Sequence, residues 1–493
     1  MTKAPIHLSR PTAVAESLHD QATDTTGFIN KKVLLTGDAD ILALYNGREC
    51  FINSLLLLAR ITPNLFVSLP EGSLLYSEVT KLVNYLSLPN KVEFISVPNF
   101  KDYQAILFVG HDAKEHLPWT TINSNGWLAR ISSMGKPISD ICQNANPIGA
   151  LAAASLGVSE IFKRLIALKP ERGQFFDKLS FSFFNYEITN QAGPEIPANL
   201  SIDFMLVGVG AIGNGIVHLL QSLQISGTLL VIDKEDFKEE NLGTCLLVGS
   251  GDVNRPKINL AKRLLDGKFK INVNKGLISE LLPRFGKEFP FPKLVVTALD
   301  NVDARREVQR LWPDLIIDGA IGELGCQVTL HPWDKNLSCL MCDYEKQPIR
   351  AEEIQSNSTG LRESRLDDPE SEISEEDVAF APDDKKNWLR NRIGKKICSV
   401  VSEATIEQIS HEKQAAGFRP SVPFVACLSA CMVTAELTRH AMKEKELLET
   451  GFQFDSLIGP HFGKPMAHSR KFTCMCTQRK DVIQALRQKR NPE

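Results

Sequence analysis

Residues 203–214 read DFMLVGVGAIGN and join an apolar segment directly to a glycine-rich turn. Gly208, Gly210 and Gly213 lie where a strand would end and a helix begin, and Asp233 follows 20 residues after the last glycine. Glycines let the backbone approach a phosphate, a helix N-terminus supplies N–H donors, and a carboxylate at this spacing binds ribose hydroxyls. The stretch therefore predicts a nucleotide-binding turn in an α/β fold. It does not by itself distinguish NAD from ATP.

Length and composition limit the classes of protein that fit. The chain has 493 residues, enough for two or three domains, and its 43% hydrophobic and 23% charged residues suit a globular protein. A net charge of −3 gives no basic footprint for nucleic acid. No apolar run approaches the ~18 residues of a membrane span, and the N-terminal residues lack the apolar core of a secretory signal. We therefore expect a cytoplasmic protein that binds neither nucleic acid nor membrane.

The sequence contains a weak internal repeat. Residues 146–164 and 422–440 each have a proline as their second residue, followed by small residues at helical spacing. In both, a glutamate follows 13 residues after the proline and a basic residue three positions later. The matching residues are Glu160 with Lys163, and Glu436 with Arg439.

Apolar segments upstream repeat in the same order. Residues 105–112 (AILFVGHD) parallel 293–300 (KLVVTALD), and residues 32–39 (KVLLTGDA) parallel 204–211 (FMLVGVGA). Apolar segments that alternate with helical ones predict parallel sheets with crossover helices. Three matched elements in one order favour a duplicated domain. The first copy lacks the glycines of the turn, so we expect it to be a scaffold.

The second copy carries a long insertion. Between the apolar segment and the closing helix the first copy has 35 residues, whereas the second has 123. The insertion contains a cysteine pair, Cys339 and Cys342, an acidic run at 363–378, and Cys398. The acidic run predicts a solvated mobile loop. Alternatively, it crosses the active site and guides a substrate tail.

Three features downstream of the turn favour ATP. Asn241 follows eight residues after the carboxylate, and Lys257 begins an amphipathic segment, where an ammonium can neutralise a triphosphate. A buried segment then ends on Asp300 and Asn301, with Arg305 close behind. A carboxylate at the carboxyl end of a parallel strand faces the ligand crevice and can hold magnesium. A hydride-transfer enzyme needs no lysine at this place, so ATP with Mg²⁺ is favoured over NAD.

Over about residues 200–345 these motifs resemble the adenylating enzymes of the ThiF, MoeB and ubiquitin-E1 superfamily. The resemblance implies an α/β fold of two tandem Rossmann-like domains that form an internal pseudo-dimer, with a cysteine-bearing insertion in the second. The chain looks most like the compact activating enzymes of bacterial ubiquitin-like operons. The implied domains are 1–195 (inactive scaffold), 196–345 (active, ATP site), 346–420 (insertion with acidic loop and catalytic cysteine) and 421–493 (closing helix and C-terminal zinc-pair segment).

The resemblance also implies roles for single residues. Asp233 would bind the ribose, Asn241 and Lys257 the phosphates, and Asp300 the magnesium ion. The residues expected at the nucleotide are Gly208, Gly210, Ala211, Ile212, Gly213, Asp233, Asn241, Lys257, Asp300, Asn301 and Arg305.

One position departs from the family pattern. The family has Asn-Leu-x-Arg where this chain has Asn241-Leu242-Gly243-Thr244, so the arginine that steadies the γ-phosphate is missing. The family often borrows an arginine from the opposite domain, which makes Arg10 and Arg48 candidates. Without a substitute we expect slow adenylation.

Cysteines supply two further hypotheses. Cys398 follows Lys395 and Lys396 and precedes a helix-like stretch, and both surroundings favour the nucleophilic thiolate. From the residues alone a buried structural cysteine is the alternative, whereas the resemblance implies the catalytic cysteine of an E1 enzyme.

Two cysteine pairs suggest a metal site. The two-residue gap of Cys339 and Cys342 lets both thiolates reach one tetrahedral ion. The resemblance implies that Cys474 and Cys476 complete a structural zinc site; the alternative is a pair of reduced surface thiols. An odd total of 11 cysteines without a secretory signal argues against a disulfide framework.

The resulting hypothesis is an E1-like activating enzyme that uses ATP, Mg²⁺ and a structural Zn²⁺. It adenylates the exposed C-terminal tail of a ubiquitin-like protein, transfers it to Cys398 as a thioester, and passes it to the cysteine of an E2-like protein. The internal pseudo-dimer predicts a monomeric chain. Four alternatives stay open: a sulfur-carrier or RNA-modifying adenylyltransferase of the same superfamily, an NAD-dependent oxidoreductase, a catalytically inactive binding scaffold, and a purely structural metal protein.

Overall fold

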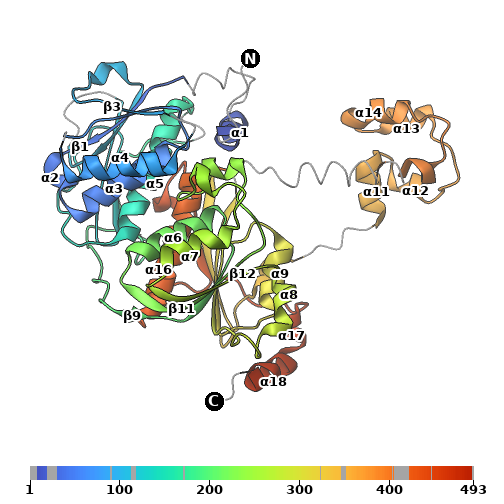
Figure 1. The fold of residues 1–493 in the computed structure, drawn as a ribbon. Helices are drawn as coiled ribbons and strands as arrows, with labels where there is room; N and C mark the ends of the chain where they lie inside the picture. Colours follow the sequence, from blue (N-terminus) through green and yellow to red (C-terminus); the bar gives the residue numbers. More distant parts are fainter. Residues whose placement is uncertain are drawn as a thin grey trace. The chain divides into compact units, whose positions relative to one another are not determined.

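The computed structural model divides the chain into two compact units, one of residues 1–344 with 420–493 and one of residues 345–419 (Figure 1). Among the described residues, no helix is both long and apolar enough to cross a membrane. The described residues are 8–18, 30–70, 72–88, 91–112, 118–169, 173–322, 324–345, 351–401, 404, 421–445 and 447–490.

The first sheet of the larger unit has the strand order β3-β2-β1-β4-β5-β6-β7-β8. The strands from β3 to β5 are parallel, and those from β6 to β8 are antiparallel. Strand β4 is buried along its whole length, as expected for a parallel strand covered on both faces. The strands are β1 (Val33–Gly37), β2 (Asn64–Val67), β3 (Lys91–Phe94), β4 (Ala105–Val109), β5 (Trp119–Asn125), β6 (Leu128–Ser132), β7 (Leu179–Ser182) and β8 (Glu187–Ile188).

The second sheet repeats this order strand for strand as β12-β11-β10-β13-β14-β15-β16-β17. It is parallel from β12 to β14 and antiparallel from β15 to β17, and a short strand β9 adds to β11. Two sheets dominated by parallel strands confirm the predicted α/β class. The strands are β9 (Leu200–Ser201), β10 (Phe204–Val207), β11 (Ile225–Asp233), β12 (Phe269–Lys275), β13 (Leu294–Thr297), β14 (Leu315–Gly322), β15 (Gly325–Pro332), β16 (Gly451–Asp455) and β17 (Lys464–Met466).

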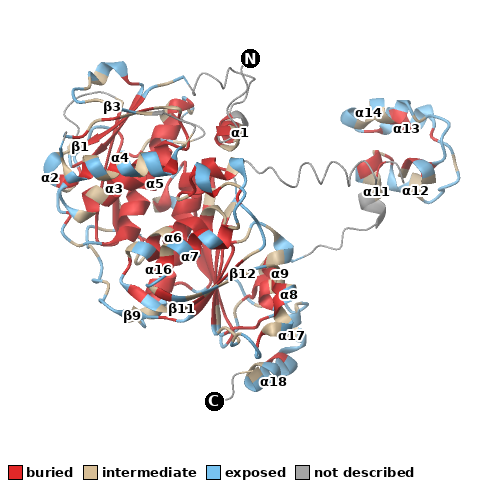
Figure 2. Ribbon diagram, viewed as in Figure 1, coloured by how far each residue is buried: buried red, intermediate tan, exposed pale blue. Residues whose placement is uncertain are grey.

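Four long helices occupy the interior of the larger unit, shown as buried in Figure 2. Helix α16 contacts both α5 and α6, and α3 contacts α5. Small residues permit this packing, because a Cβ on Gly215 of α6 would lie 2.7 Å from Ala430 of α16. One continuous hydrophobic core therefore reaches across both sheets. These helices are α3 (Tyr45–Leu58), α5 (Pro147–Leu165), α6 (Ala211–Ser222) and α16 (Pro423–Ala441).

The repeated acid–base residues of α5 and α16 form buried ion pairs. Lys163 binds Glu160, and Nη1 of Arg439 lies 3.2 Å from Oε1 of Glu436. A buried ion pair needs further hydrogen bonds to offset its lost hydration. Glu160 accepts one from the N–H of Phe176, and Glu436 accepts one from the hydroxyl of Tyr186, each at 2.8 Å.

Other helices and 3-10 turns complete the larger unit. The α-helices are α1 (Ser9–Ser17), α2 (Ala39–Leu42), α4 (Leu74–Leu86), α7 (Lys257–Leu265), α8 (Ile278–Leu281), α9 (Val302–Gln309), α10 (Leu340–Asp343), α17 (Met475–Gln478) and α18 (Lys480–Arg490). The 3-10 turns are η3 (Phe100–Asp102), η4 (Glu239–Gly243), η5 (Ser250–Asp252), η6 (Leu282–Arg284) and η7 (Pro460–Phe462).

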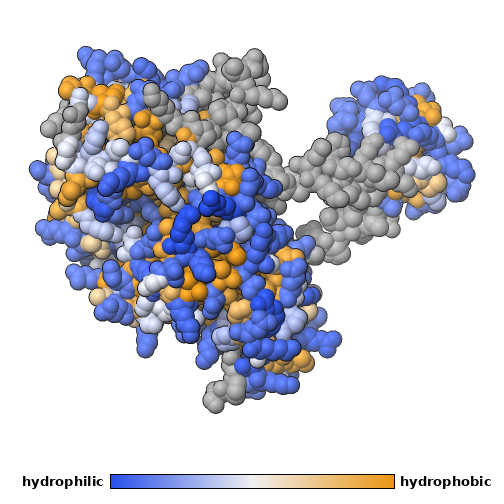
Figure 3. All heavy atoms as spheres, in the orientation of Figure 1, coloured by the Kyte–Doolittle hydropathy of each residue, from blue (hydrophilic) through white to orange (hydrophobic). Residues whose placement is uncertain are grey.

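The smaller unit is helical and has its own apolar core. Its visible surface is largely hydrophilic (Figure 3). Its helices are α11 (Ala351–Thr359), α12 (Glu363–Leu366), α13 (Glu375–Phe380) and α14 (Asp383–Arg390). The buried hydrophobic residues are Leu361, Ile373, Val378, Ala381, Leu389, Ile397 and Val400.

The loop predicted for the acidic run 363–378 is wrong, because α12 and the start of α13 lie within it. Ser374 and Asp377 form a capping box at the start of α13. The guanidinium of Arg365 binds both carboxylate oxygens of Asp377, at 2.7 and 3.1 Å. The interspersed apolar residues Ile373 and Val378 enter the core, so this run orders despite its charge.

We predict that His218 makes the larger unit sensitive to acid. Its Nε2 on α6 lies 2.7 Å from Oδ1 of Asn53 on α3, and burial lowers the pKa of His218 to about 4. The pKa of His218 in the folded protein lies below the ordinary value of 6.5, so the unfolded chain binds the proton more readily. The contribution of neutral His218 to the unfolding free energy is therefore fully present above pH 6.5 and is lost as the pH falls toward 4. Between pH 7.5 and 5 we expect His218 to remove about 2 kcal/mol from the unfolding free energy.

The measurement is urea unfolding of the wild type and of His218→Gln at both pH values. The wild type should lose more stability than the variant on acidification. Equal losses in the two proteins would show that His218 does not titrate in this way.

Candidate active site

The turn between β10 and α6 requires glycine at two of its positions. Gly208 has φ +96°, and a Cβ there would lie 2.5 Å from the carbonyl oxygen of Ala298. A Cβ on Gly213 would lie 2.1 Å from the carbonyl oxygen of Gly208. Gly210 caps the start of α6 and faces open space, with nothing within 4 Å of its Cβ position. The turn thus leaves a helix N-terminus open to a ligand at Gly210 and, behind it, at Ala211 and Ile212.

Two carboxylates lie at strand ends on either side of this turn. Strand β10 pairs with β11, which ends on Asp233, and with β13, which is followed by Asp300. The strand order reverses here, and open α/β sheets bind ligands outside the carboxyl ends of strands at such a point. The structure therefore brings Asp233, Asp300 and the glycine turn to one edge, as the sequence predicted.

Asp233 supports the turn directly. Its carboxylate accepts hydrogen bonds from the N–H groups of Val209, at 2.7 Å, and Glu235, at 2.8 Å. Burial raises the pKa of Asp233, an effect that Lys257 and the two N–H donors oppose. The carboxylate is thus fixed beside the residue that precedes Gly210.

Lys257 is a buried ammonium at the first position of α7. Only 6% of the residue is exposed, and its Nζ lies 2.7 Å from Oε2 of Glu235. Burial would lower the pKa of Lys257, but the negative charge of Asp233 and the contact with Glu235 oppose this effect, and the pKa is raised. Lys257 therefore carries a positive charge into the region beside Asp233.

Asn241 lies on the 3-10 turn η4, where it is 8% exposed. Its Oδ1 accepts a hydrogen bond of 2.8 Å from the N–H of Lys238. Four residues further on lies the buried thiol of Cys245, whose pKa is raised by burial, an effect that nearby cations partly oppose. Those cations are Lys257, Arg10 and Arg60.

Arg10 reaches this region from the other end of the sequence. Its Nη2, on α1, lies 2.7 Å from Oε1 of Glu240, the neighbour of Asn241. Arg48, in contrast, binds Glu78 through Nε at 2.8 Å, so it lies among the helices of the first sheet. Of the two arginines that the sequence nominated, Arg10 is the one that the structure places beside η4.

Arg305 is held in a network of protein groups. Its guanidinium binds Asp318 and the carbonyl oxygen of Leu299, and it donates to the hydroxyl of Tyr344 at 2.9 Å. Thr297 also binds Asp318. The contacts support the edge that carries Asp300, while the predicted contact of Arg305 with a nucleotide stays a prediction.

Sequence reasoning missed the partners of Arg305. Asp318 and Tyr344 were not singled out, although an aspartate inside the apolar strand LIIDGAIG is a recognisable signal. Asn301 was singled out, and its Oδ1 caps α9 by accepting the N–H of Ala304 at 2.7 Å.

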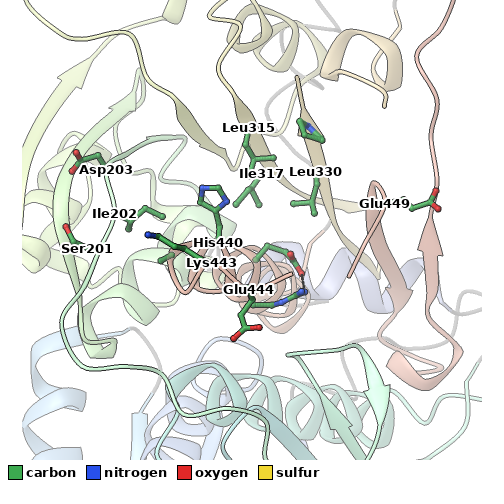
Figure 4. A pocket seen from close by; sticks show the side chains of 14 residues that line it. Ser201, Ile202, Asp203, Leu315, Ile317, Leu330, His440, Lys443, Glu444 and Glu449 are labelled. Carbon is green, nitrogen blue, oxygen red and sulfur yellow. Dashed lines mark hydrogen bonds and ion pairs between the residues drawn. The ribbon is translucent and has the colours of Figure 1, made fainter. Parts of the chain in front are cut away.

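Two cavities open on the second sheet. One of about 410 Å³ lies at the carboxyl end of β14 and is lined by Ala320, Gly322, Gly325, Cys326, Gln327, Gln453, Phe454, Asp455, Phe462 and Lys464. The larger, of about 500 Å³, lies at the opposite ends of β10 and β14, where His440 and Lys443 face Ile202 and Ile317 (Figure 4). None of the predicted site residues lines the larger cavity.

Four cysteines meet as the sequence predicted. The Sγ–Sγ separations are 3.7 Å for Cys339 and Cys342, 3.7 Å for Cys339 and Cys474, and 3.5 Å for Cys342 and Cys476. Tetrahedral zinc with Zn–S bonds of about 2.3 Å requires separations of about 3.8 Å. The pKa of Cys342 is lowered because the other three thiols donate to its sulfur. The donor set therefore fits zinc, while the bound ion itself stays a prediction.

Cys398 lies in the smaller unit, in the first turn of a helical segment that begins at Ile397. Its side chain is partly exposed, between the buried Ile397 and Val400. The N–H of Cys398 donates to the carbonyl oxygen of Pro369 at 2.9 Å. Lys396, two residues before Cys398, binds Glu370 at 2.6 Å, and this contact raises the pKa of the lysine. An accessible thiol near an ammonium suits a nucleophile, a role that stays a prediction.

Comparison with known proteins shows the family to which the chain is related. A model described as the ThiF family matches residues 199–476. An uncharacterized protein of Sinorhizobium fredii, y4jF, is 25% identical over 389 residues, which cover 75% of this chain and 74% of that protein.

Shorter matches link the chain to NEDD8-activating enzyme E1 catalytic subunits. The one from Dictyostelium discoideum is 26% identical over 149 residues, or 29% of this chain, and the one from Schizosaccharomyces pombe 28% over 128 residues, or 25%. The matches span only 33% and 28% of those subunits. The crystal structure of E. coli MccB with ATP aligns over 56% of this chain and 67% of that chain, with 16% identity and a TM-score of 0.35.

We predict that the purified protein holds about one zinc ion per chain. Cys342→Ser should lower the zinc content measured by elemental analysis and the unfolding temperature, because a structural zinc contributes folding free energy directly. Cys427→Ser, at a buried thiol outside the cluster, serves as the control and should retain the metal. A metal-free wild type that unfolds at the same temperature with and without added zinc would refute the site.

Proposed function

Because this chain belongs to the ThiF family, we propose that it uses ATP to adenylate the C-terminal carboxylate of a ubiquitin-like protein. The carboxylate oxygen attacks the α-phosphorus, the bond to the bridging oxygen breaks, and pyrophosphate leaves. The mixed anhydride with AMP makes a poor acyl donor reactive. Mg²⁺ held at Asp300 would supply charge neutralisation at the phosphates.

The observation that carries this proposal is the buried ammonium of Lys257 beside Asp233 and the glycine turn. Phosphoryl chemistry depends on positioning and on neutralising charge, which a preorganised lysine and a helix N-terminus provide. On binding, a triphosphate would replace Glu235 as the partner of Lys257. An NAD-dependent hydride transfer, in contrast, does not require a lysine at this position.

Arg10 is proposed to replace the arginine missing from the family pattern. The supporting fact is its 2.7 Å contact with Glu240, next to Asn241. Its positive charge also acts on Cys245, as does that of Lys257, so the two cations lie around the same loop. A γ-phosphate bound beside this loop would contact both Arg10 and Lys257.

The 410 Å³ cavity is proposed to receive the substrate tail. Gly322 and Gly325 form part of its lining, and nothing lies within 4 Å of the Cβ position of Gly322. The amides of Gln327 and Gln453 offer donors and acceptors for an extended backbone. These features suit a narrow tail that ends in glycine.

The domain organisation is also part of the proposal. The identical strand order of the two sheets supports an internal pseudo-dimer, with residues 1–195 as the inactive domain and 196–345 as the active one. Residues 346–420 form the insertion that carries Cys398, and 421–493 the closing helix with the second cysteine pair. One chain would then suffice for activity.

Cys398 is proposed as the acceptor of the activated tail. Its thiolate attacks the acyl carbon of the adenylate, AMP leaves, and a thioester forms. The cysteine of an E2-like protein then takes the acyl group by exchange of one thioester for another. Its side chain is partly exposed, so a substrate tail can reach the sulfur.

We predict that the protein binds MgATP in calorimetry and does not bind NAD. Lys257→Met and Arg10→Ala should each weaken ATP binding about 10-fold or more, because each loses a charge-assisted contact worth about 1.5–3 kcal/mol. The matched controls are Lys275→Met, which breaks a surface pair with Asp236, and Arg48→Ala. NAD binding with no ATP binding would reject the proposal.

We also predict an adduct between the protein and a small protein with a two-glycine tail when ATP is present. An added thiol should cleave the adduct by taking up the acyl group, and Cys398→Ala should abolish the adduct while ATP–pyrophosphate exchange persists. An adduct that survives in Cys398→Ala would identify another nucleophile.

A further inference from the structure

Arg60 is a fully buried arginine that follows α3, with 0% of the residue exposed. Its Nη1 donates to the carbonyl oxygen of Leu56 at 2.7 Å, in the last turn of α3. Its Nε and Nη2 donate to the carbonyl oxygens of Cys245 and Val248, each at 2.9 Å. Within the described part of the chain, no carboxylate forms an ion pair with it.

A buried charge without a counter-ion is unusual, because lost hydration is normally restored by a paired group. Burial lowers the pKa of Arg60 to about 10, so the guanidinium is still charged at neutral pH. Three carbonyl dipoles take the place of a carboxylate. One of these carbonyls, that of Leu56, lies in the last turn of α3, where the helix dipole also favours a cation. The buried guanidinium thus binds two backbone carbonyls of a segment more than 180 residues away in the sequence.

The segment that Arg60 holds continues directly from Asn241. Residues 244–248 connect η4 to the stretch that leads to Lys257. From the opposite side, Oδ1 of Asn214 accepts the N–H of Leu247 at 2.6 Å, and Asn214 follows Gly213 on α6. The segment is therefore fixed between an arginine after α3 and the helix that the glycine turn begins.

We propose that Arg60 is a positioning residue for the nucleotide site, an inference that rests on the proposed function. It holds residues 241–248 at a fixed distance from the turn at Gly210, so that Asn241 and Lys257 face the phosphates together. Arg60 itself does not contact the nucleotide. The first half of the chain would thus position the loop after η4 through Arg60, in addition to supplying Arg10.

The test compares Arg60→Met with Arg130→Met in the full-length protein. Arg130 is a matched control, because it is also buried, at 3% exposure, and donates to a backbone carbonyl, that of Ile141 at 2.5 Å. Its contact stays within the first half. Both variants lose a buried arginine, so both should unfold at a lower temperature.

Only Arg60→Met should alter the nucleotide site. We expect its Kd for MgATP to rise about 10-fold and hydrogen exchange of the 241–248 amides to become faster, with Arg60→Lys restoring part of both because one ammonium can reach one carbonyl. A folded Arg60→Met with wild-type Kd and exchange would overturn the inference. A wild type that binds no ATP would instead defeat the proposed function, while the exchange measurement would still report on the contact.

If Arg60→Met does not fold, Asn214→Ala tests the same segment from the other side. It removes the acceptor of the Leu247 N–H. Faster exchange of the 241–248 amides together with weaker ATP binding supports the inference. Unchanged ATP binding despite faster exchange overturns it, because the position of the segment would then not matter to the nucleotide.

Discussion

The contact between Gly213 and the carbonyl oxygen of Gly208 sets the geometry on which the site depends. A Cβ at Gly213 would lie 2.1 Å from that oxygen, and one at Gly208 would lie 2.5 Å from Ala298, so both positions exclude side chains. Only this close approach lets α6 begin directly above the end of β10, with its free N–H groups at the edge where the strand order reverses. Asp233 then fixes the turn by accepting the N–H of Val209.

The two sheets have one topology but contribute differently to the site. The second sheet carries Asp233 and the glycine turn, and helix α7 beside it carries Lys257, whereas the first sheet lacks a comparable turn. The first half instead reaches the loop after η4 through Arg60 and Arg10. Both contacts join residues far apart in sequence, so a defect in the first half is expected to disturb η4 and the loop that follows it.

The sequence was sufficient for features that depend on local pattern. Strand ends and the glycine turn follow from apolar periodicity and short spacings, and the structure confirms them. The meeting of the two cysteine pairs was implied by the family resemblance, and the structure places the four thiols together. Features that depend on distant contacts were not predictable. Nothing in the sequence distinguishes Arg10 from Arg48, since only the fold brings Arg10 to Glu240. The acidic run was misread because its charges were counted without the apolar Ile373 and Val378 that enter a core.

The most direct test of the account is a crystal structure of the protein with Mg²⁺ and a non-hydrolysable ATP analogue. The account predicts the ribose at Asp233, the triphosphate at Gly210, and Nζ of Lys257 moved from Glu235 to a phosphate oxygen. A nucleotide bound elsewhere, or a triphosphate at the turn with Lys257 still paired to Glu235, would contradict it.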